Sequence, residues 1–165
     1  MAELDGRVVL VVGASGGLGS RLVAELAAAG ATVLSASRSS SASLDLRDPQ
    51  SIRDYVGGLS ALDGVIVAAG VVAFGPAEQV SDTVLAELFE TNALGPITLI
   101  RELTPLLAES AAAGRTPFIV TLSGIVAESP TAGLAAYSAS KSALAAFVSA
   151  ASRELRRTGI RVLDA

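Results

Sequence analysis

Two titratable residues, Tyr137 and Lys141, stand four positions apart in the sequence. The sequence has 12 basic residues, and Lys141 alone among them is a lysine. On a helix this spacing places both side chains on one face, where the ammonium stabilises a phenolate and its flexible stem can also reach a ribose hydroxyl. The pattern predicts that Tyr137 donates and accepts a proton in catalysis. An exposed helical pair in an alanine-rich sequence would have the same spacing, so the surrounding elements must decide.

The composition excludes several kinds of chemistry. Having no cysteine and no histidine, the sequence lacks disulfides, thiolate nucleophiles, thiolate metal ligands and the commonest general base. We therefore expect no metal site, and any acid or base must be tyrosine, lysine, aspartate or glutamate. The net charge of −4 argues against a nucleic-acid partner. No apolar run approaches the ~20 residues of a membrane span, and the N-terminus has no basic signal region, so we expect a cytoplasmic protein without a membrane partner.

A glycine-rich turn follows the first apolar run. Residues 7–12 are typical of a strand buried in a parallel sheet, and leucines and alanines recur at helical spacing over residues 18–29. Between a strand and a helix, such a turn allows close backbone approach and offers helix N-terminal amides to a pyrophosphate. The candidate residues for this contact are Gly13, Ser15, Gly16, Gly17, Leu18 and Gly19. The alternative is a turn that only packs the helix on the strand.

The remaining segments continue an alternation of strands and helices. Predicted strands cover residues 7–12, 31–36, 43–46, 64–68, 117–122 and 160–163. Predicted helices cover residues 18–29, 49–56, 81–91, 96–113 and 134–157, while a serine-rich turn at residues 39–43 replaces a helix. This order predicts one α/β dinucleotide-binding domain over residues 1–165, with a doubly wound parallel sheet of about six strands.

Two residues next to predicted strands are candidates for contact with the adenosine half of a dinucleotide. Arg38 follows the second strand, where an acidic residue would favour NAD and an arginine can pair with the 2′-phosphate of NADP. Arg38 therefore predicts NADP in preference to NAD, although a solvated arginine at a strand end is the alternative. Asp45, near the third strand, is a candidate for contact with the adenine amino group, or else a turn-forming aspartate.

Taken together, six residues resemble the classical short-chain dehydrogenase/reductase family, which has a Rossmann fold: Gly13, Gly17, Gly19, Asn92, Tyr137 and Lys141. The resemblance covers essentially the whole chain. It implies that Tyr137 is the acid/base, that Lys141 assists it and holds the nicotinamide ribose, and that Asn92 anchors a proton-relay water. It further implies hydride transfer between the nicotinamide and a small-molecule carbonyl or secondary alcohol.

The sequence departs from the family's cofactor pattern at two places. Val12 stands where the family usually has threonine, and the segment at residues 67–70 reads Val-Ala-Ala-Gly where the family has Asn-Asn-Ala-Gly. By the resemblance, Ala69 and Gly70 remain cofactor contacts. Both departures replace polar side chains by apolar ones, so we expect the region to repack without abolishing cofactor binding.

A third departure concerns the catalytic serine. Gly124 occupies the position of that serine, and Ser123 lies one residue earlier. In extended chain a shift of one residue turns the side chain to the opposite face. Ser123 can therefore serve as the fourth catalytic residue only if the strand end is bulged or the following loop is longer. The sequence leaves this role open.

Two functions fit these patterns: an NADP-dependent oxidoreductase, or an NADP(H)-binding sensor or partner subunit without efficient catalysis, which Gly124 favours. In the family, a Pro-Gly turn, a substrate-covering segment and a last strand follow the sixth strand, so we expect this domain to lack that C-terminal part. The helices at residues 96–113 and 134–157 carry apolar residues on more than one face. They predict a homodimer or homotetramer.

Overall fold

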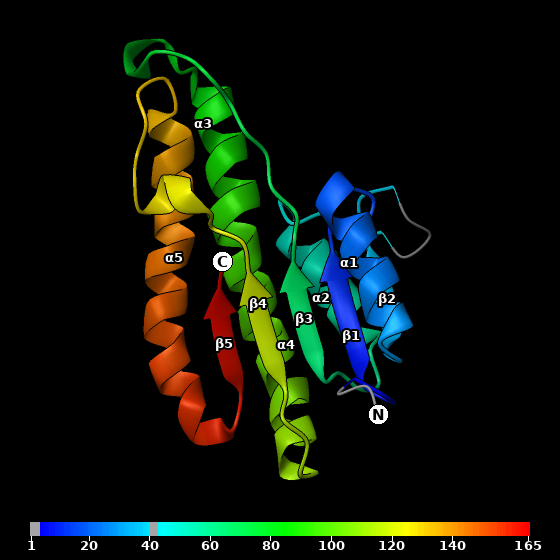
Figure 1. Ribbon diagram of the computed structural model, residues 1–165. Helices are drawn as coiled ribbons and strands as arrows, with labels where there is room; N and C mark the ends of the chain where they lie inside the picture. Colours follow the sequence, from blue (N-terminus) through cyan, green and yellow to red (C-terminus); the bar gives the residue numbers. More distant parts are fainter. Residues whose placement is uncertain (1–3, 40–42) are drawn as a thin grey trace.

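A parallel sheet forms the centre of the molecule. The computed structural model describes residues 4–39 and 43–165. The described strands form a 5-stranded sheet in the order β2-β1-β3-β4-β5, in which all neighbours are parallel (Figure 1). The strands are β1 (Val8–Val12), β2 (Thr32–Ala36), β3 (Gly64–Val67), β4 (Phe118–Thr121) and β5 (Arg161–Asp164).

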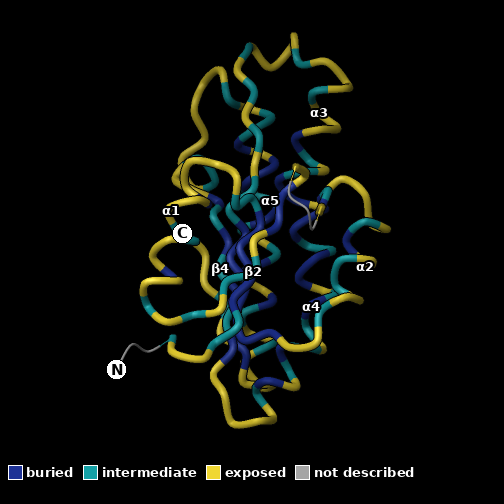
Figure 2. The backbone as a smooth tube through the Cα atoms, turned by 90° about the vertical axis from the view of Figure 1, so that its right-hand side faces the viewer, coloured by how far each residue is buried: buried dark blue, intermediate teal, exposed yellow. Residues whose placement is uncertain are grey.

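Helices cover both faces of this sheet. The helices are α1 (Gly17–Ala28), α2 (Pro49–Gly57), α3 (Asp82–Phe89), α4 (Gly95–Ala112) and α5 (Ala135–Leu155), with 3₁₀ turns η1 (Ala77–Gln79), η3 (Ile125–Ala127) and η4 (Arg156–Thr158) and a π-helix η2 (Glu90–Leu94). On one face Leu26 of α1 packs with Val9 and Ile66. On the other, Ile52 of α2 and Leu103 of α4 belong to the larger core cluster. Figure 2 shows the buried strands between these two layers, which confirms the doubly wound fold.

Local sequence signals set the helix ends. Asp48 accepts a hydrogen bond from the Gln50 amide and Pro49 opens α2, while Ser81 caps α3 through the Val84 amide. Gly30 follows α1 with a φ of 90°, the left-handed conformation that stops a helix. None of the described helices is long and apolar enough to cross a membrane.

The predicted third strand, at residues 43–46, is wrong. Among the described residues of this segment, Ser43 forms one isolated bridge with Ser37, and the Asp45 amide bonds to the hydroxyl of Ser51 on α2 instead of a neighbouring strand. Leu44 and Leu46 are both buried because they pack in the core. Their spacing of two residues is the same as that of side chains on one face of a strand. The serine-rich turn predicted at residues 39–43 lies largely outside the described residues.

The two helices predicted at residues 81–91 and 96–113 are one nearly continuous structure. The π-helix η2 joins α3 to α4, with one widened turn around Asn92. A Cβ atom at Gly95 would lie 2.3 Å from the Leu46 carbonyl oxygen and 2.9 Å from that of Glu90. Glycine is therefore required where the helix turns close to the segment after β2.

The carboxyl edge of the sheet gathers the predicted functional segments. The chain leaves β1 toward β2 on one side and returns to β3 on the other, so the strand order reverses at β1. Doubly wound folds bind ligands in the crevice at such a reversal. The glycine turn after β1, the segment after β3 and the end of β4 all lie at this edge (Figure 1).

Candidate cofactor site and active site

Two glycines of the turn are required by close backbone packing. Gly13 has a φ of 86°, and a Cβ atom there would lie 2.6 Å from the Ala69 amide nitrogen. A Cβ at Gly19 would lie 2.1 Å from the Gly13 carbonyl oxygen. The turn is also anchored to β2, because the amides of Gly13 and Ala14 both bond to the carbonyl of Ala36. These contacts bring α1 against the segment after β3.

Gly17 is different, because a Cβ there would meet nothing within 4 Å. It opens α1, and the preceding Gly16 gives that helix no side-chain cap. The amides of a first helical turn have no partner within the helix, so they are available to an anion. Leu18, also predicted to contact the cofactor, is 54% exposed.

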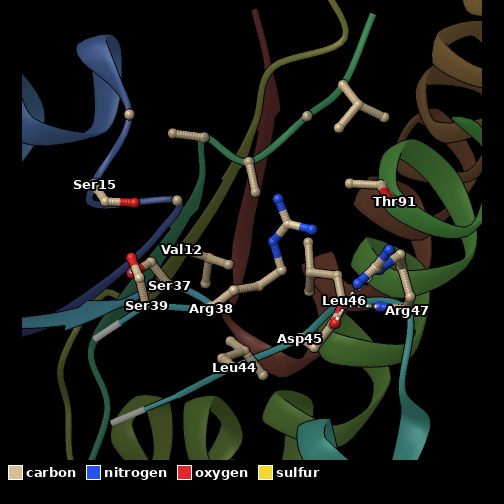
Figure 3. A pocket seen from close by; sticks show the side chains of 16 residues that line it. Val12, Ser15, Ser37, Arg38, Ser39, Leu44, Asp45, Leu46, Arg47 and Thr91 are labelled. Atoms are coloured by element: carbon tan, nitrogen blue, oxygen red, sulfur yellow. Dashed lines mark hydrogen bonds and ion pairs between the residues drawn. The ribbon is translucent and has the colours of Figure 1, made fainter. Parts of the chain in front are cut away.

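A cavity of about 610 Å³ opens beside this turn. Figure 3 shows its lining, which comes from the turn after β1, the end of β2, the segment before α2 and the segment after β3. Of the predicted cofactor residues, those that line it are Gly13, Ser15, Gly16, Arg38, Asp45, Ala69 and Gly70. Gly17, Leu18 and Gly19 lie in the first turn of α1, next to the lining residues.

Two arginines line the cavity, on the side of the segment that follows β2. The Arg38 side chain extends into the cavity (Figure 3). Arg47, which the sequence analysis did not single out, donates to both carboxylate oxygens of Asp45, with Nη2 at 2.8 Å from Oδ2 and Nε at 3.1 Å from Oδ1. The hydrogen bond from Arg47 lowers the pKa of the Asp45 carboxyl. Asp45 is thus engaged by a neighbour two residues on, which competes with its predicted adenine contact.

Asn92 is held at the edge by the π-helix. Its side chain is 1% exposed and pairs with the backbone of Val71 in both directions, accepting from the amide at 2.9 Å and donating to the carbonyl at 2.8 Å. It also donates to Ser140 Oγ at 3.0 Å. π-helical turns are frequent at functional sites because they re-aim one side chain. Here the turn fastens the segment after β3 to α5.

Lys141 reaches the same point from α5. It is 7% exposed, and its Nζ donates to the Leu122 carbonyl at 2.7 Å and lies 6.0 Å from the centre of the Tyr137 ring. A Cβ at Gly70 would lie 3.4 Å from this Nζ and 3.2 Å from Asn92 Oδ1. Burial lowers the pKa of Lys141, and the Asp164 carboxylate acts in the opposite direction. The structure therefore brings Lys141 and Asn92 together beside Gly70, with the Tyr137 ring next to the Lys141 ammonium.

Ser123 has a different partner. Its hydroxyl donates to Asp164 Oδ2, and its amide donates to Asp164 Oδ1 at 3.2 Å. Because a serine hydroxyl has one proton, this bond leaves none for a substrate oxygen while it persists. Gly124 has a φ of 74°, a conformation that glycine adopts more easily than serine.

The sequence analysis missed Asp164 and Thr121. These residues are register partners at the carboxyl ends of β5 and β4, and Thr121 Oγ1 donates to Asp164 Oδ1 at 2.6 Å. The available signal was a polar residue at the end of each of two apolar strands. No such signal marked Arg47, which directly follows the segment that imitates a strand. The described residues contain no cluster of three or more side chains placed to bind a metal.

Comparison with known proteins places this geometry in a family. Residues 40–164 match the family model for short chain dehydrogenases. No curated protein matches the chain. Three solved structures illustrate the structural likeness. A short-chain dehydrogenase from Streptomyces avermitilis is 29% identical with a TM-score of 0.88, and the match covers 97% of this chain and 65% of that one.

A metagenomic short-chain oxidoreductase in complex with NADP is also 29% identical, with a TM-score of 0.89 over 98% of this chain and 82% of that one. A 3-ketoacyl-(acyl-carrier-protein) reductase from Brucella melitensis, complexed with NADH, shares the fold at 23% identity, with a TM-score of 0.89 over 97% of this chain and 74% of that one. The chain thus spans about two thirds to four fifths of these relatives. With the family model matched over most of its length, it belongs to the short-chain dehydrogenase family.

Proposed function

We propose that this protein is an NADP-dependent oxidoreductase that transfers a hydride between nicotinamide and a small carbonyl or secondary alcohol. The observation that carries the proposal is the convergence of Tyr137, Lys141 and Asn92 at the carboxyl edge, beside the cavity of the glycine turn. A lysine is rarely this deeply buried unless polar partners hold it, because taking an ammonium out of water is unfavourable. Its position beside a tyrosine and a buried asparagine is that of a proton-transfer site.

The residues at this edge fit a dinucleotide. Packing within the chain explains Gly13 and Gly19 but leaves Gly17 without a reason, since a side chain there would meet open space. A pyrophosphate against the first turn of α1 supplies that reason. We infer that the chain is one dinucleotide-binding domain. Its cofactor contacts would be the glycine turn, Arg38, Asp45, Ala69 and Gly70. When the cofactor is bound, its nicotinamide supplies or accepts the hydride.

Residues of the chain would transfer the proton. In reduction, the Tyr137 hydroxyl donates its proton to the substrate oxygen as the carbonyl becomes an alcohol, and the Lys141 ammonium stabilises the phenolate that remains. Asn92 Oδ1 keeps a second lone pair beyond the one that accepts from Val71. That lone pair can accept a hydrogen bond from a water that returns the proton to Tyr137.

Replacing Tyr137 by phenylalanine tests the proposal. We expect Tyr137→Phe to lower kcat by about 10²–10⁴-fold, because the proton donor is lost, while NADPH affinity stays within a few-fold. A screen of small aldehydes and ketones with NADPH oxidation as the readout would measure turnover. Tyr55→Phe is the matched control, since Tyr55 is the only other tyrosine of the sequence and lies on α2. Equal turnover in wild type and Tyr137→Phe would refute the proton-transfer role.

The preference for NADP rests on Arg38. Its guanidinium lies in the cavity, where a 2′-phosphate can accept charge-assisted hydrogen bonds (Figure 3). We expect Arg38→Ala to weaken NADPH binding by about 10–100-fold and NADH binding hardly at all, as judged by cofactor fluorescence titration. Arg53→Ala, which removes an exposed arginine from α2, is the control. Equal losses for both cofactors would assign Arg38 another role.

A second function is favoured by the hydrogen bond from Ser123 to Asp164 and by Gly124. With the serine hydroxyl engaged, the chain would bind NADP(H) as a sensor or partner subunit and turn over poorly. Ser123→Ala separates the two functions. Loss of a donor to the substrate oxygen lowers the rate by about 10²–10³-fold. We expect that loss if Ser123 turns to the substrate during catalysis, and less than about a three-fold change if it stays on Asp164.

We also propose that the protein forms a homodimer or homotetramer through α4 and α5. The sequence of both helices is apolar on more than one face, and apolar surface that the sheet does not cover favours association. Light scattering over a hundred-fold dilution series would measure the mass. A monomer mass at every concentration would contradict this assembly.

A further inference from the structure

Among the described residues, the buried ammonium of Lys141 donates a hydrogen bond to one acceptor, the Leu122 carbonyl. A carbonyl is neutral, so it satisfies one N–H without balancing the charge. Around Lys141, α5 contributes the neutral phenol of Tyr137, η2 the amide of Asn92, and the segment after β3 the backbone of Gly70. The charged group that acts on Lys141 is Asp164 of β5.

Asp164 is bound to the end of β4 on both sides of Leu122. Its Oδ1 accepts from Thr121 Oγ1 at 2.6 Å and from the Ser123 amide at 3.2 Å, and its Oδ2 accepts from the Ser123 hydroxyl. Thr121 and Ser123 are 0% and 5% exposed. The residue between them, Leu122, is the one whose carbonyl holds Lys141. One carboxylate therefore fixes the conformation of the chain that presents this carbonyl.

We propose that Asp164 is a positioning residue for Lys141: its carboxylate fixes the Leu122 carbonyl through Thr121 and Ser123, and its negative charge balances the buried ammonium. A carboxylate suits this role better than an amide, since three donors converge on its two oxygens and an amide has one acceptor oxygen. The consequence for turnover rests on the proposed function, in which Lys141 assists Tyr137. The link between Asp164 and Lys141 does not, because it concerns the protonation of one side chain.

The sequence makes this link directly measurable, because Lys141 is its only lysine. Protein grown with ¹³C-labelled lysine, and carrying a lysine-free tag, gives one lysine ¹³Cε signal whose chemical shift follows the protonation of Lys141. We expect Asp164→Asn to lower the midpoint of that titration by about one pH unit, because the balancing charge is lost. Asp164→Glu keeps the charge and should restore most of the midpoint. A midpoint in Asp164→Asn equal to that of wild type would overturn the proposal.

The control is Glu128→Gln, which removes an exposed carboxylate just after η3 and should leave the midpoint unchanged. Circular dichroism of each variant confirms that it is folded. If Asp164→Asn does not fold, Ser123→Ala and Thr121→Val decide, since each removes one donor through which the carboxylate fixes the Leu122 carbonyl and keeps the carboxylate charge. A lower midpoint in these variants supports the proposal, and a midpoint equal to or above that of wild type overturns it. The titration uses no substrate, so it gives its answer even if the chain has no turnover.

Discussion

Two charged side chains are buried at opposite edges of the same sheet, and they differ in their hydrogen-bond and ion-pair partners. At the amino edge, Asp63 is 3% exposed and accepts hydrogen bonds from Ser110 Oγ at 2.6 Å and from the Val8 amide at 2.8 Å, and it forms an ion pair with Arg115. At the carboxyl edge, Lys141 is 7% exposed and donates to one carbonyl, while its balancing carboxylate, Asp164, is bound to other groups.

Both environments lower the pKa of the buried group, but the consequence for the charged form differs. Burial alone would raise the pKa of Asp63, but the bonds from Ser110 and Val8 and the charge of Arg115 lower it overall, so the charged form is favoured. Burial of Lys141 lowers its pKa, so its charged form is disfavoured. The amino edge is thus built to keep a charge for stability. The carboxyl edge holds a charge whose protonation is easier to change.

The largest expected effect that separates the two edges is on turnover. Lys141→Met should lower kcat by about 10²-fold or more, because no cation remains beside Tyr137. The same variant should change the free energy of unfolding by less than about 1 kcal/mol, since it also removes the penalty for burying an ammonium. Turnover assays and urea unfolding would measure the two effects. A strongly destabilised variant would show that Lys141 has a structural role like that of Asp63.

At the amino edge we expect a substitution to lower stability and to leave cofactor binding unchanged. Asp63→Asn should lower the free energy of unfolding by about 2 kcal/mol, because an amide has one acceptor oxygen for the donors Ser110 and Val8, and because Arg115, whose side chain is 44% exposed, loses its ion-pair partner. NADPH affinity should stay within about two-fold, since the cavity lies at the other edge of the sheet. Glu109→Gln, an exposed carboxylate of α4 at the same edge, is the control. Loss of cofactor binding in a folded Asp63→Asn variant would contradict the separation.

Lowering the pH should reduce the contribution of Asp63 to the free energy of unfolding. Because the pKa of Asp63 is lower in the folded state, its contribution is fully present above the unfolded value of 3.8 and is lost as pH falls through the folded value. The difference in unfolding free energy between wild type and Asp63→Asn should therefore narrow by about 1 kcal/mol as pH falls from 5 to 3. Urea unfolding over this range would measure it. A constant difference would mean that the Asp63 charge does not contribute.

At alkaline pH, the carboxyl edge should also gain stability as pH rises. Because the pKa of Lys141 is lowered in the folded state, the unfolded chain binds more protons between that value and the ordinary 10.5. Wild type should therefore gain stability relative to Lys141→Met as pH rises through this window, by less than about 1 kcal/mol. Urea unfolding of both proteins from pH 8 to 10.5 would test the sign. A loss relative to Lys141→Met would show that the fold favours the charged form.

Most of the architecture was predictable because it follows from local patterns. The apolar run of β1, the glycine turn and the period of α1 are each encoded within a few residues, and they specify a βαβ unit with its nucleotide site. The pair Tyr137 and Lys141 was predictable for the same reason, since its spacing has meaning on any helix. The strand at residues 43–46 was not excluded, because Leu44 and Leu46 are buried by contacts that the local pattern does not reveal.

Long-range contacts were harder to predict. Asp164 meets Ser123 across 41 positions of sequence, and their hydrogen bond depends on the register of β4 with β5. The sequence therefore left open whether Ser123 fills the role of the family's serine, because it did not reveal that Asp164 accepts the hydrogen bond of the Ser123 hydroxyl. The π-helix around Asn92 was not predicted either, and it leads into Gly95, which lies against Leu46 of the segment after β2.

Gly124 also limits how this chain could be changed. A Cβ atom there would have open space around it, so crowding does not prevent a larger residue. The backbone does, because a φ of 74° costs an L-amino acid about 1 kcal/mol or more. A single Gly124→Ser substitution would therefore either strain this turn or relax it and displace the Ser123 anchor on Asp164. A serine at residue 124 would be free of this cost only with a different backbone conformation of the turn, which is the same turn that presents Ser123 to Asp164.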